Sequence, residues 1–578
     1  MNSDGISWWL MWRISDRRSR SFLILFIFTS LTLPQSVQGQ TASPSSDGET
    51  TIFECPIHNS STPIERIAAS MPSTEGIRGE AQEFFRVSDF EFIGNTVFSQ
   101  AELDRALVEF RDRDLRFAEF IEAVSLVTKL YNDRGYLNSY AVPYPQKITD
   151  GVIKIAIIEG GLGTISLIRQ GRGRLRPQYI CRRLAIATAP LNTHKLLHAL
   201  RLLQLDPLIA NLSTNLVKGP RLEEHDLQLY FEETPTFNIT LGADNSRAPS
   251  VGSFRRHIQL THQNLLGFGD RLYLTYSNTD GSDNFATSYS FPINARNGTL
   301  RLGYGTATNR VIEPPFNAID LRGDSRYFDI ALRQPFWQTE RREFGFGVGF
   351  SRRETDTSIL GSSFPLSPGG DRRGRTRLSV LDISQDALWR RERQSFIVQS
   401  QFNLGLGLFD ATVRSESPDG RFFAWRGQAQ WVYRFTPRTL LLVKGNVQLS
   451  DGELVSLERF GFGGAGTVRG YRQEIRLTDN GALASVEFRY PIIGNTESKW
   501  GMLQVAPFMD FGTGWNHDRK SNVSPQTLAS LGLGLRWQMR DRARASLYWG
   551  IPLVDVDSRD RTWQENGLHF SVQTRLSL

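Results

Sequence analysis

The sequence predicts a mainly β protein, with a roughly 16-stranded antiparallel transmembrane β-barrel preceded by two small α+β units of order βααββ. Three observations lead to this prediction. The amino terminus has an export signal, residues 84–235 mix strand and helix signals in a repeating order, and residues 236–578 alternate apolar and polar side chains.

Residues 1–39 have the features of a secretory signal peptide. Four arginines precede an apolar run at residues 22–33, and the small residue Gly39 marks the expected cleavage position. The run is shorter than the roughly 20 apolar residues that a membrane-spanning helix needs. An uncleaved signal anchor is the alternative. The four arginines are Arg13, Arg17, Arg18 and Arg20.

Residues 40–83 are expected to form a periplasmic linker. The stretch from Ile64 to Ala69 is a weak candidate for a short plug helix, ended by Pro72. The two cysteines of the chain, Cys55 and Cys181, lie far apart in the sequence. We expect two unrelated thiols, with neither a disulfide framework nor a metal site.

Two successive segments, residues 84–160 and 161–235, share the order strand, helix, helix, strand, strand. In the first, Ser99 and Glu102 form a capping box and Gly135 is placed to end the second helix. Such units leave an exposed strand edge beside a helix, a geometry that accepts an extended peptide. A spacer role is the alternative.

Residues 236–578 have the period of two that is typical of strands with one apolar face. A soluble sandwich or solenoid also fits this period, but about 340 residues is large for one sandwich. At roughly 21 residues per strand and connection, the segment holds about 16 strands, an even number that suits a closed antiparallel barrel. Aromatic residues near strand ends are expected to form interfacial girdles: Trp337, Trp389, Trp425, Trp431, Tyr490, Trp500, Trp515, Trp537 and Trp549.

Several functional classes are excluded by the sequence. The net charge of +7 is spread over single arginines rather than a basic helix or patch, so no nucleic-acid partner is expected. Beyond the signal, no run of 18 apolar residues predicts a spanning helix. No P-loop, nucleophile elbow or zinc-ligand spacing occurs, so we expect neither enzymatic activity nor a cofactor or metal.

A glycine-rich hinge at residues 461–466 indicates a functional loop. It precedes a tetrad whose arginine can fold back into a barrel and meet a carboxylate there. Period two puts Asp510 on the inward, polar face of its strand with Gln504 and Phe508, and Glu487 also points inward. Ordinary lumenal carboxylates are the alternative for both. The tetrad is Val468, Arg469, Gly470 and Tyr471.

Three motifs together resemble the two-partner secretion (TpsB) translocators of the hemolysin secretion and activation family. They are the segment from Phe90 to Phe98, the tetrad around Arg469, and the strand motif formed by Phe508, Asp510 and Gly512. The resemblance spans nearly the whole mature chain. It implies POTRA domains at 84–160 and 161–235, a barrel at 236–578, and an inward-folding loop around 460–475 whose Arg469 pairs with Asp510.

The resemblance also implies a function. A member of this family exports an unfolded, β-helical, hemolysin- or hemagglutinin-like exoprotein without nucleotide, in type V secretion. The region from Phe84 to Pro235 would bind the amino-terminal secretion domain of that partner. Outer-membrane lipids and the barrel-assembly machinery are the other expected partners, and the location is the outer membrane of a Gram-negative-type bacterium, with the POTRA domains in the periplasm. A barrel-assembly insertase and a passive porin are the alternatives.

Overall fold

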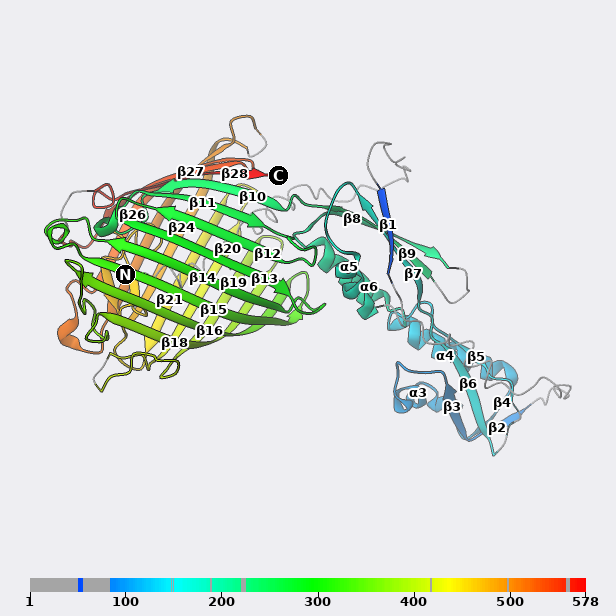
Figure 1. Ribbon diagram of the computed structural model, residues 1–578. Coiled ribbons are helices and arrows are strands. Elements are labelled where there is room, and N and C mark those ends of the chain that lie inside the picture. Colours follow the sequence, from blue (N-terminus) through cyan, green and yellow to red (C-terminus); the bar gives the residue numbers. More distant parts are fainter. Residues whose placement is uncertain are drawn as a thin grey trace. The chain divides into compact units, whose positions relative to one another are not determined.

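The computed structural model describes residues 50–55, 84–146, 148, 150–187, 190–219, 225–415, 418–495, 498–557 and 562–578. The expected signal peptide and the helix candidate at 64–69 lie outside these residues. The chain divides into two compact units, one within Ser43–Thr234 and one within Pro235–Leu578 (Figure 1). In the described segments, no helix combines the length and apolarity needed to cross a bilayer.

The first α+β half packs its helices against a small sheet of order β3-β6-β5. The Glu102 carboxylate accepts from the Ser99 N–H at 3.0 Å, as in the expected capping box, and Gly135, at φ +88°, follows the long helix. The elements are β2 (Phe85–Val87), β3 (Asp89–Ile93), α3 (Gln100–Ala106), a 3-10 turn (Val108–Phe110), β4 (Arg113–Leu115), α4 (Phe117–Asp133), β5 (Tyr140–Pro143) and β6 (Val152–Ile158).

One buried polar cluster fixes the turn after β3. The Tyr131 hydroxyl on α4 donates to Glu159 at 2.8 Å, and that carboxylate also accepts from the Thr96 N–H at 2.8 Å. Burial, reinforced by the bond to Glu159, raises the pKa of Tyr131, so its hydroxyl remains a donor. The motif from Phe90 to Phe98 is therefore held to the rest of its half.

The second half repeats the predicted order but adds a strand. Its sheet has the order β1-β7-β9-β8, in which β1 pairs antiparallel with β7. That strand comes from the segment expected to be a linker. The elements are β1 (Thr50–Cys55), β7 (Leu162–Gln170), α5 (Pro177–Leu184), a 3-10 turn (Ala185–Ala187), α6 (Thr193–Gln204), β8 (Ile209–Lys218) and β9 (His225–Glu233).

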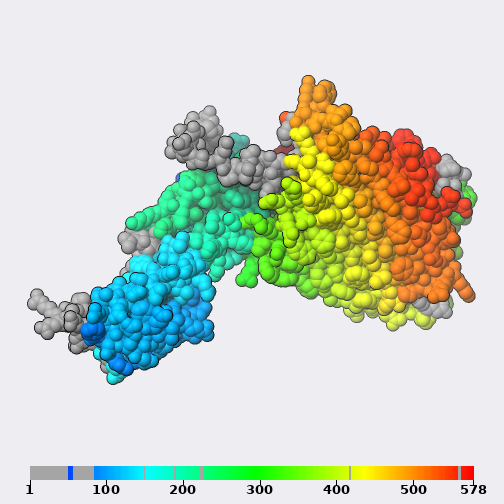
Figure 2. All heavy atoms as spheres, turned by 180° about the vertical axis from the view of Figure 1, so that it is seen from behind, coloured from blue at the N-terminus to red at the C-terminus, as the bar shows by residue number. Residues whose placement is uncertain are grey.

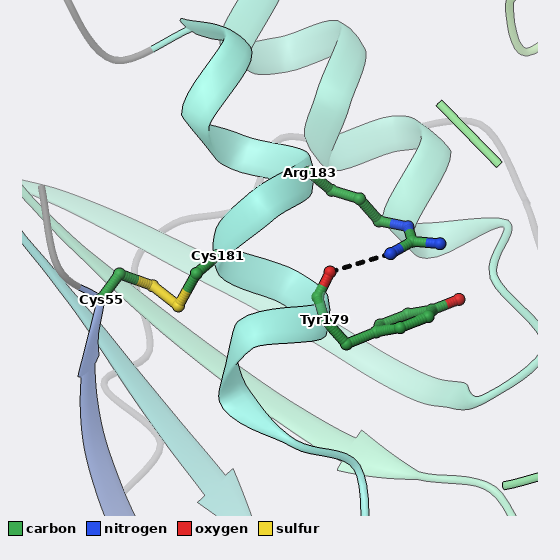
Figure 3. Close-up of a disulfide and its surroundings, with 4 residues drawn as sticks. All are labelled: Cys55, Tyr179, Cys181 and Arg183. Carbon is green, nitrogen blue, oxygen red and sulfur yellow. Dashed lines mark hydrogen bonds between the residues drawn. A yellow bond between two sulfur atoms is a disulfide. The ribbon is translucent and has the colours of Figure 1, made fainter. Parts of the chain in front are cut away.

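Cys55 and Cys181 form a disulfide, so the prediction of two unrelated thiols is wrong (Figure 3). Strand pairing is the physical reason: Cys55 lies opposite Ile165 of β7, and this places it 5.5 Å from Cys181 of α5, Cα to Cα. A sequence separation of 126 residues gives no sign of this proximity. The bond closes a covalent ring that contains the whole first half.

The disulfide generates a prediction for the intact protein. After cleavage at a protease site inserted at Asp112, the two fragments should stay joined until reductant is added, whereas the Cys55→Ser variant should separate at once. Loss of the bond should lower the free energy of unfolding of this unit by roughly 2–4 kcal/mol, because the unfolded chain gains freedom. Denaturing gels with and without reductant, together with urea unfolding, measure both effects. Separation of the wild-type fragments without reductant would contradict the bond.

In the described part of the second unit, sixteen strands of at least eight residues close into an antiparallel barrel, with β10 pairing β28 from Asn238↔Ser577 to Asp244↔Ser571. The two-residue β17 lies in the connection after β16. The strands are β10 (Phe237–Asp244), β11 (Arg255–His262), β12 (Arg271–Asn278), β13 (Ser282–Pro292), β14 (Thr299–Arg310), β15 (Arg322–Gln338), β16 (Arg342–Ile359), β18 (Arg375–Arg390), β19 (Gln394–Leu406), β20 (Phe423–Arg434), β21 (Leu440–Ser450), β24 (Asn480–Gly494), β25 (Met502–Trp515), β26 (Thr527–Met539), β27 (Ala543–Pro552) and β28 (Leu568–Ser577).

The barrel wall presents apolar side chains outward. On β28, Val572 and Leu576 are about half exposed, while His569 is buried on the inner side. Figure 2 shows the later strands, coloured yellow to red, as a continuous surface. Connections at one end are short, such as 339–341, whereas most of those at the other end are longer, with 279–281 as the exception. This is the pattern of outer-membrane barrels, in which lipid covers the apolar face.

Candidate functional site

The longest of these connections, residues 451–479, folds back against the inside of the barrel. Its hairpin pairs β22 (Phe460–Phe462) with β23 (Arg476–Thr478), and the side chains of Phe462 and Val468 are fully buried against Leu483 of the wall. Gly512 makes this approach possible, because a Cβ there would lie 2.8 Å from Val468 Cγ2. The glycine of the predicted strand motif therefore accommodates the loop.

Arg469 contacts Asp510 of β25 through three donors. The backbone N–H and Nε donate to Asp510 Oδ2 at 3.0 and 2.7 Å, and Nη2 donates to Oδ1 at 2.8 Å. The Ser485 hydroxyl of β24 also donates to Oδ1, at 2.7 Å. This fork-to-carboxylate geometry is the strong form of an ion pair, and a lysine lacks it.

Glu487 of β24 completes the site. Arg469 donates to it through Nη1, and Glu487 also accepts from Arg489 Nε at 2.6 Å and from the Tyr548 hydroxyl at 3.3 Å. The Arg469 guanidinium carbon lies 3.6 Å from the centre of the Phe508 ring, within cation–π range. The second carboxylate thus joins the contact, and Phe508 covers the guanidinium.

Gly470 and Tyr471 contact the next strands of the wall, β26 to β28. Gly470 has φ +97° and lies so close to β27 that a Cβ would be 2.9 Å from the Gly550 carbonyl oxygen. Its N–H donates to His569 Nε2 at 3.2 Å, and the Tyr471 hydroxyl donates to the Ala529 carbonyl at 2.8 Å. Only a glycine fits here without strain.

The charges at this site are buried and mutually compensated. Arg469 is 6 % exposed, Asp510 is fully buried, and Glu487 is 4 % exposed. Removing one partner from a buried pair leaves an uncompensated charge and costs about 3–5 kcal/mol. In the described ranges, no group of acidic, histidine or cysteine side chains has a metal-binding arrangement. The site is thus a buried ionic contact between the loop and two strands of the wall.

The structure brings together every residue of the two predicted motifs and Glu487. Sequence reasoning missed Arg489, Tyr548 and Gly550, which complete the surroundings of Arg469. Arg489 could have been found, because it is two residues after Glu487 on the same strand and so faces the same side. No local sequence pattern identifies Tyr548 and Gly550 of β27 as part of this site.

A closed 16-strand barrel with an inward-folded loop, in a chain that also carries an α+β unit of POTRA type, defines the class of POTRA-bearing outer-membrane transporters. The family model "Haemolysin secretion/activation protein ShlB/FhaC/HecB" matches residues 223–537. The model of a ShlB-type POTRA domain matches residues 85–160. The chain belongs to this family.

Two relatives match most of this chain and most of their own length. The heme/hemopexin transporter protein HuxB of Haemophilus influenzae is 21% identical over 80% of this chain and 82% of its own. The outer membrane transporter CdiB of Escherichia coli is 23% identical over 84% and 82%. A solved structure of CdiB from Escherichia coli aligns over 89% of this chain and 95% of its own, with a TM-score of 0.64 and 18% identity. That likeness shows the shared fold.

The close approach at Gly470 predicts a local effect. Gly470→Ala should displace the loop from β27, because the new methyl group meets a carbonyl oxygen and φ is positive. Gly466→Ala is the matched control, since a Cβ there has open space. Accessibility of the loop to protease on intact cells measures displacement. Equal protection of both variants would show that the contact does not position the loop.

Proposed function

We propose that the protein exports an unfolded partner exoprotein through its barrel without nucleotide, and that Arg469 is the latch of the channel. The observation that carries this proposal is the burial of a loop arginine between Asp510 and Glu487 on adjacent wall strands. A tether made of charges is specific yet breakable, since an arriving chain offers polar groups that replace it. The relatives HuxB and CdiB are described as transporters, and this supports a role in transport.

The α+β unit supplies the proposed binding site for the partner. Strand β8 is an edge of the second sheet, and nearly all of its ten residues expose their side chains. Edge strands pair readily with added strands, and in this sheet β1 is already such an addition. We propose that 161–235 is a second POTRA domain and that an extended segment of the partner's amino-terminal secretion domain adds to β8.

The proposed partner is a β-helical, hemolysin- or hemagglutinin-like exoprotein that folds outside the cell, which prevents its return. The POTRA domains would then lie in the periplasm, and the barrel would contact outer-membrane lipids after insertion by the barrel-assembly machinery. A porin needs no POTRA domain, so the match at residues 85–160 favours export over passive diffusion.

The latch predicts that Arg469→Ala inserts normally but loses export. Asp510 loses its guanidinium partner and Glu487 keeps only Arg489, and the resting position of the loop is destabilised by about 3–5 kcal/mol, a shift of more than about 100-fold in its equilibrium. Arg333→Ala is the matched control, because Arg333 also contacts two carboxylates, Asp386 and Glu343, but from the wall. Secretion of the partner is measured in cells, with insertion checked by heat-modifiable gel mobility. Export that persists in Arg469→Ala, or a general failure of other barrels to assemble, would exclude the proposal.

The binding site predicts a position-specific cross-link. A photoreactive amino acid at Leu216 of β8 should capture the partner's secretion domain, whereas one at Ile186 should not. The two side chains are similarly exposed, at 45% and 55%, so exposure alone does not distinguish them. Cross-linked products are identified by mass spectrometry during active export. Equal capture at both positions would argue against strand addition at β8.

A further inference from the structure

The two residues after the tetrad connect the loop to the outer rim of the barrel. Arg472 Nη1 donates to Glu313 Oε1 at 2.7 Å and to Glu565 Oε1 at 3.2 Å. Glu313 belongs to the connection between β14 and β15, and Glu565 to the connection between β27 and β28. The side chains of all three are largely buried, at 18%, 14% and 1% exposure.

Gln473 adds a second link through Gln564, which is fully buried. The Gln473 N–H donates to Gln564 Oε1 at 2.9 Å, and Gln564 Nε2 donates to the Arg247 carbonyl at 2.7 Å. Arg247 follows β10, and Asn245, two residues before it, donates to the Leu568 carbonyl of β28 at 2.8 Å. The tip of the loop is thus connected to the outer end of the junction between the first and last strands.

The connection that contains Glu313 is also bonded to a further connection at the rim. The Ile312 N–H donates to the Ser250 carbonyl in the connection between β10 and β11, at 2.9 Å. Four outer connections are therefore joined, and Arg472 is the cation between the two carboxylates that they contribute.

We propose that Arg472, with Glu313 and Glu565, forms an outer clasp that closes the exit of the barrel and must open for the partner to leave. The inference rests on the proposed export through the lumen, but it concerns a different contact. Arg469 binds two wall strands, whereas Arg472 binds two connections at the rim. Arg472 is a positioning residue: it acts by holding these connections together.

A cavity inside the barrel supports an exit at this rim. It has a volume of about 160 Å³, and its lining includes Arg255, Tyr273 and Asp329 of the wall and Leu457 of the loop. Arg247 also lines it, and the Arg247 carbonyl is the acceptor of the Gln564 bond. The cavity therefore extends to Arg247, the residue that Gln564 binds.

Conductance in planar bilayers tests the clasp without any partner. Purified Arg472→Ala should show several-fold more open time than wild type, and Glu565→Gln should show a smaller increase, because Arg472 keeps its bidentate contact with Glu313. Arg421→Ala is the matched control, since Arg421 pairs with Asp419 inside a single outer connection. Wild-type conductance in both Arg472→Ala and Glu565→Gln would overturn the inference.

A reversible cross-link tests the clasp during export. In Arg472→Cys with Glu565→Cys, a bis-maleimide reagent with a disulfide in its spacer should add to both thiols, join the two connections and stop export, and reductant should cleave the spacer and restore export. Wild type treated identically controls for reduction of the Cys55–Cys181 bond. Undiminished export by the cross-linked protein would overturn the clasp. The proposed function would remain, because its own test is Arg469→Ala. If this double variant does not insert, the conductance measurement decides.

Discussion

The burial of one guanidinium inside the barrel constrains much of the surrounding sequence. Arg469 needs two carboxylates from neighbouring strands, and the Phe508 and Tyr548 rings must lie against it. Those rings have room because the facing positions on β26 are glycines: a Cβ at Gly532 would lie 2.3 Å from Phe508, and one at Gly534 would lie 2.4 Å from Tyr548. A buried charge with this many partners is stable in one geometry and costly in others.

In the α+β unit, the main constraint is that an edge strand of the second sheet must be covered. Without β1, strand β7 would be the exposed edge of the second sheet. The chain covers it with its own segment and fixes that segment covalently to α5. Among the described residues, the sheet therefore ends in two edge strands: β1, whose last residue Cys55 is joined by the disulfide to α5, and β8.

Sequence patterns predicted what depends on local periodicity. Period two indicated a barrel and the inward face of Asp510, and the capping box at Ser99 indicated the start of α3. The disulfide and the contacts of Arg472 could not be predicted, because each depends on which segments the closed fold brings together. Glu313 and Arg472, for example, are 159 residues apart, and neither lies in a recognisable motif. Charge type alone does not select a partner among many lumenal and rim residues.

The ionic contacts of Arg469 and Arg472 stabilise one position of the loop, and the proposed export requires a free-energy source that displaces it. A ligand shifts an equilibrium only by its differential affinity for the two states. To change a loop from 99% inward to 99% displaced, a ligand must bind the displaced state more tightly than the inward state by about 5.5 kcal/mol. A single surface ion pair contributes far less than this, whereas the buried cluster at Arg469 is of the right size. In the proposed export, the partner would have to bind the displaced state through many contacts, and an unfolded exoprotein that arrives as an extended chain could make them.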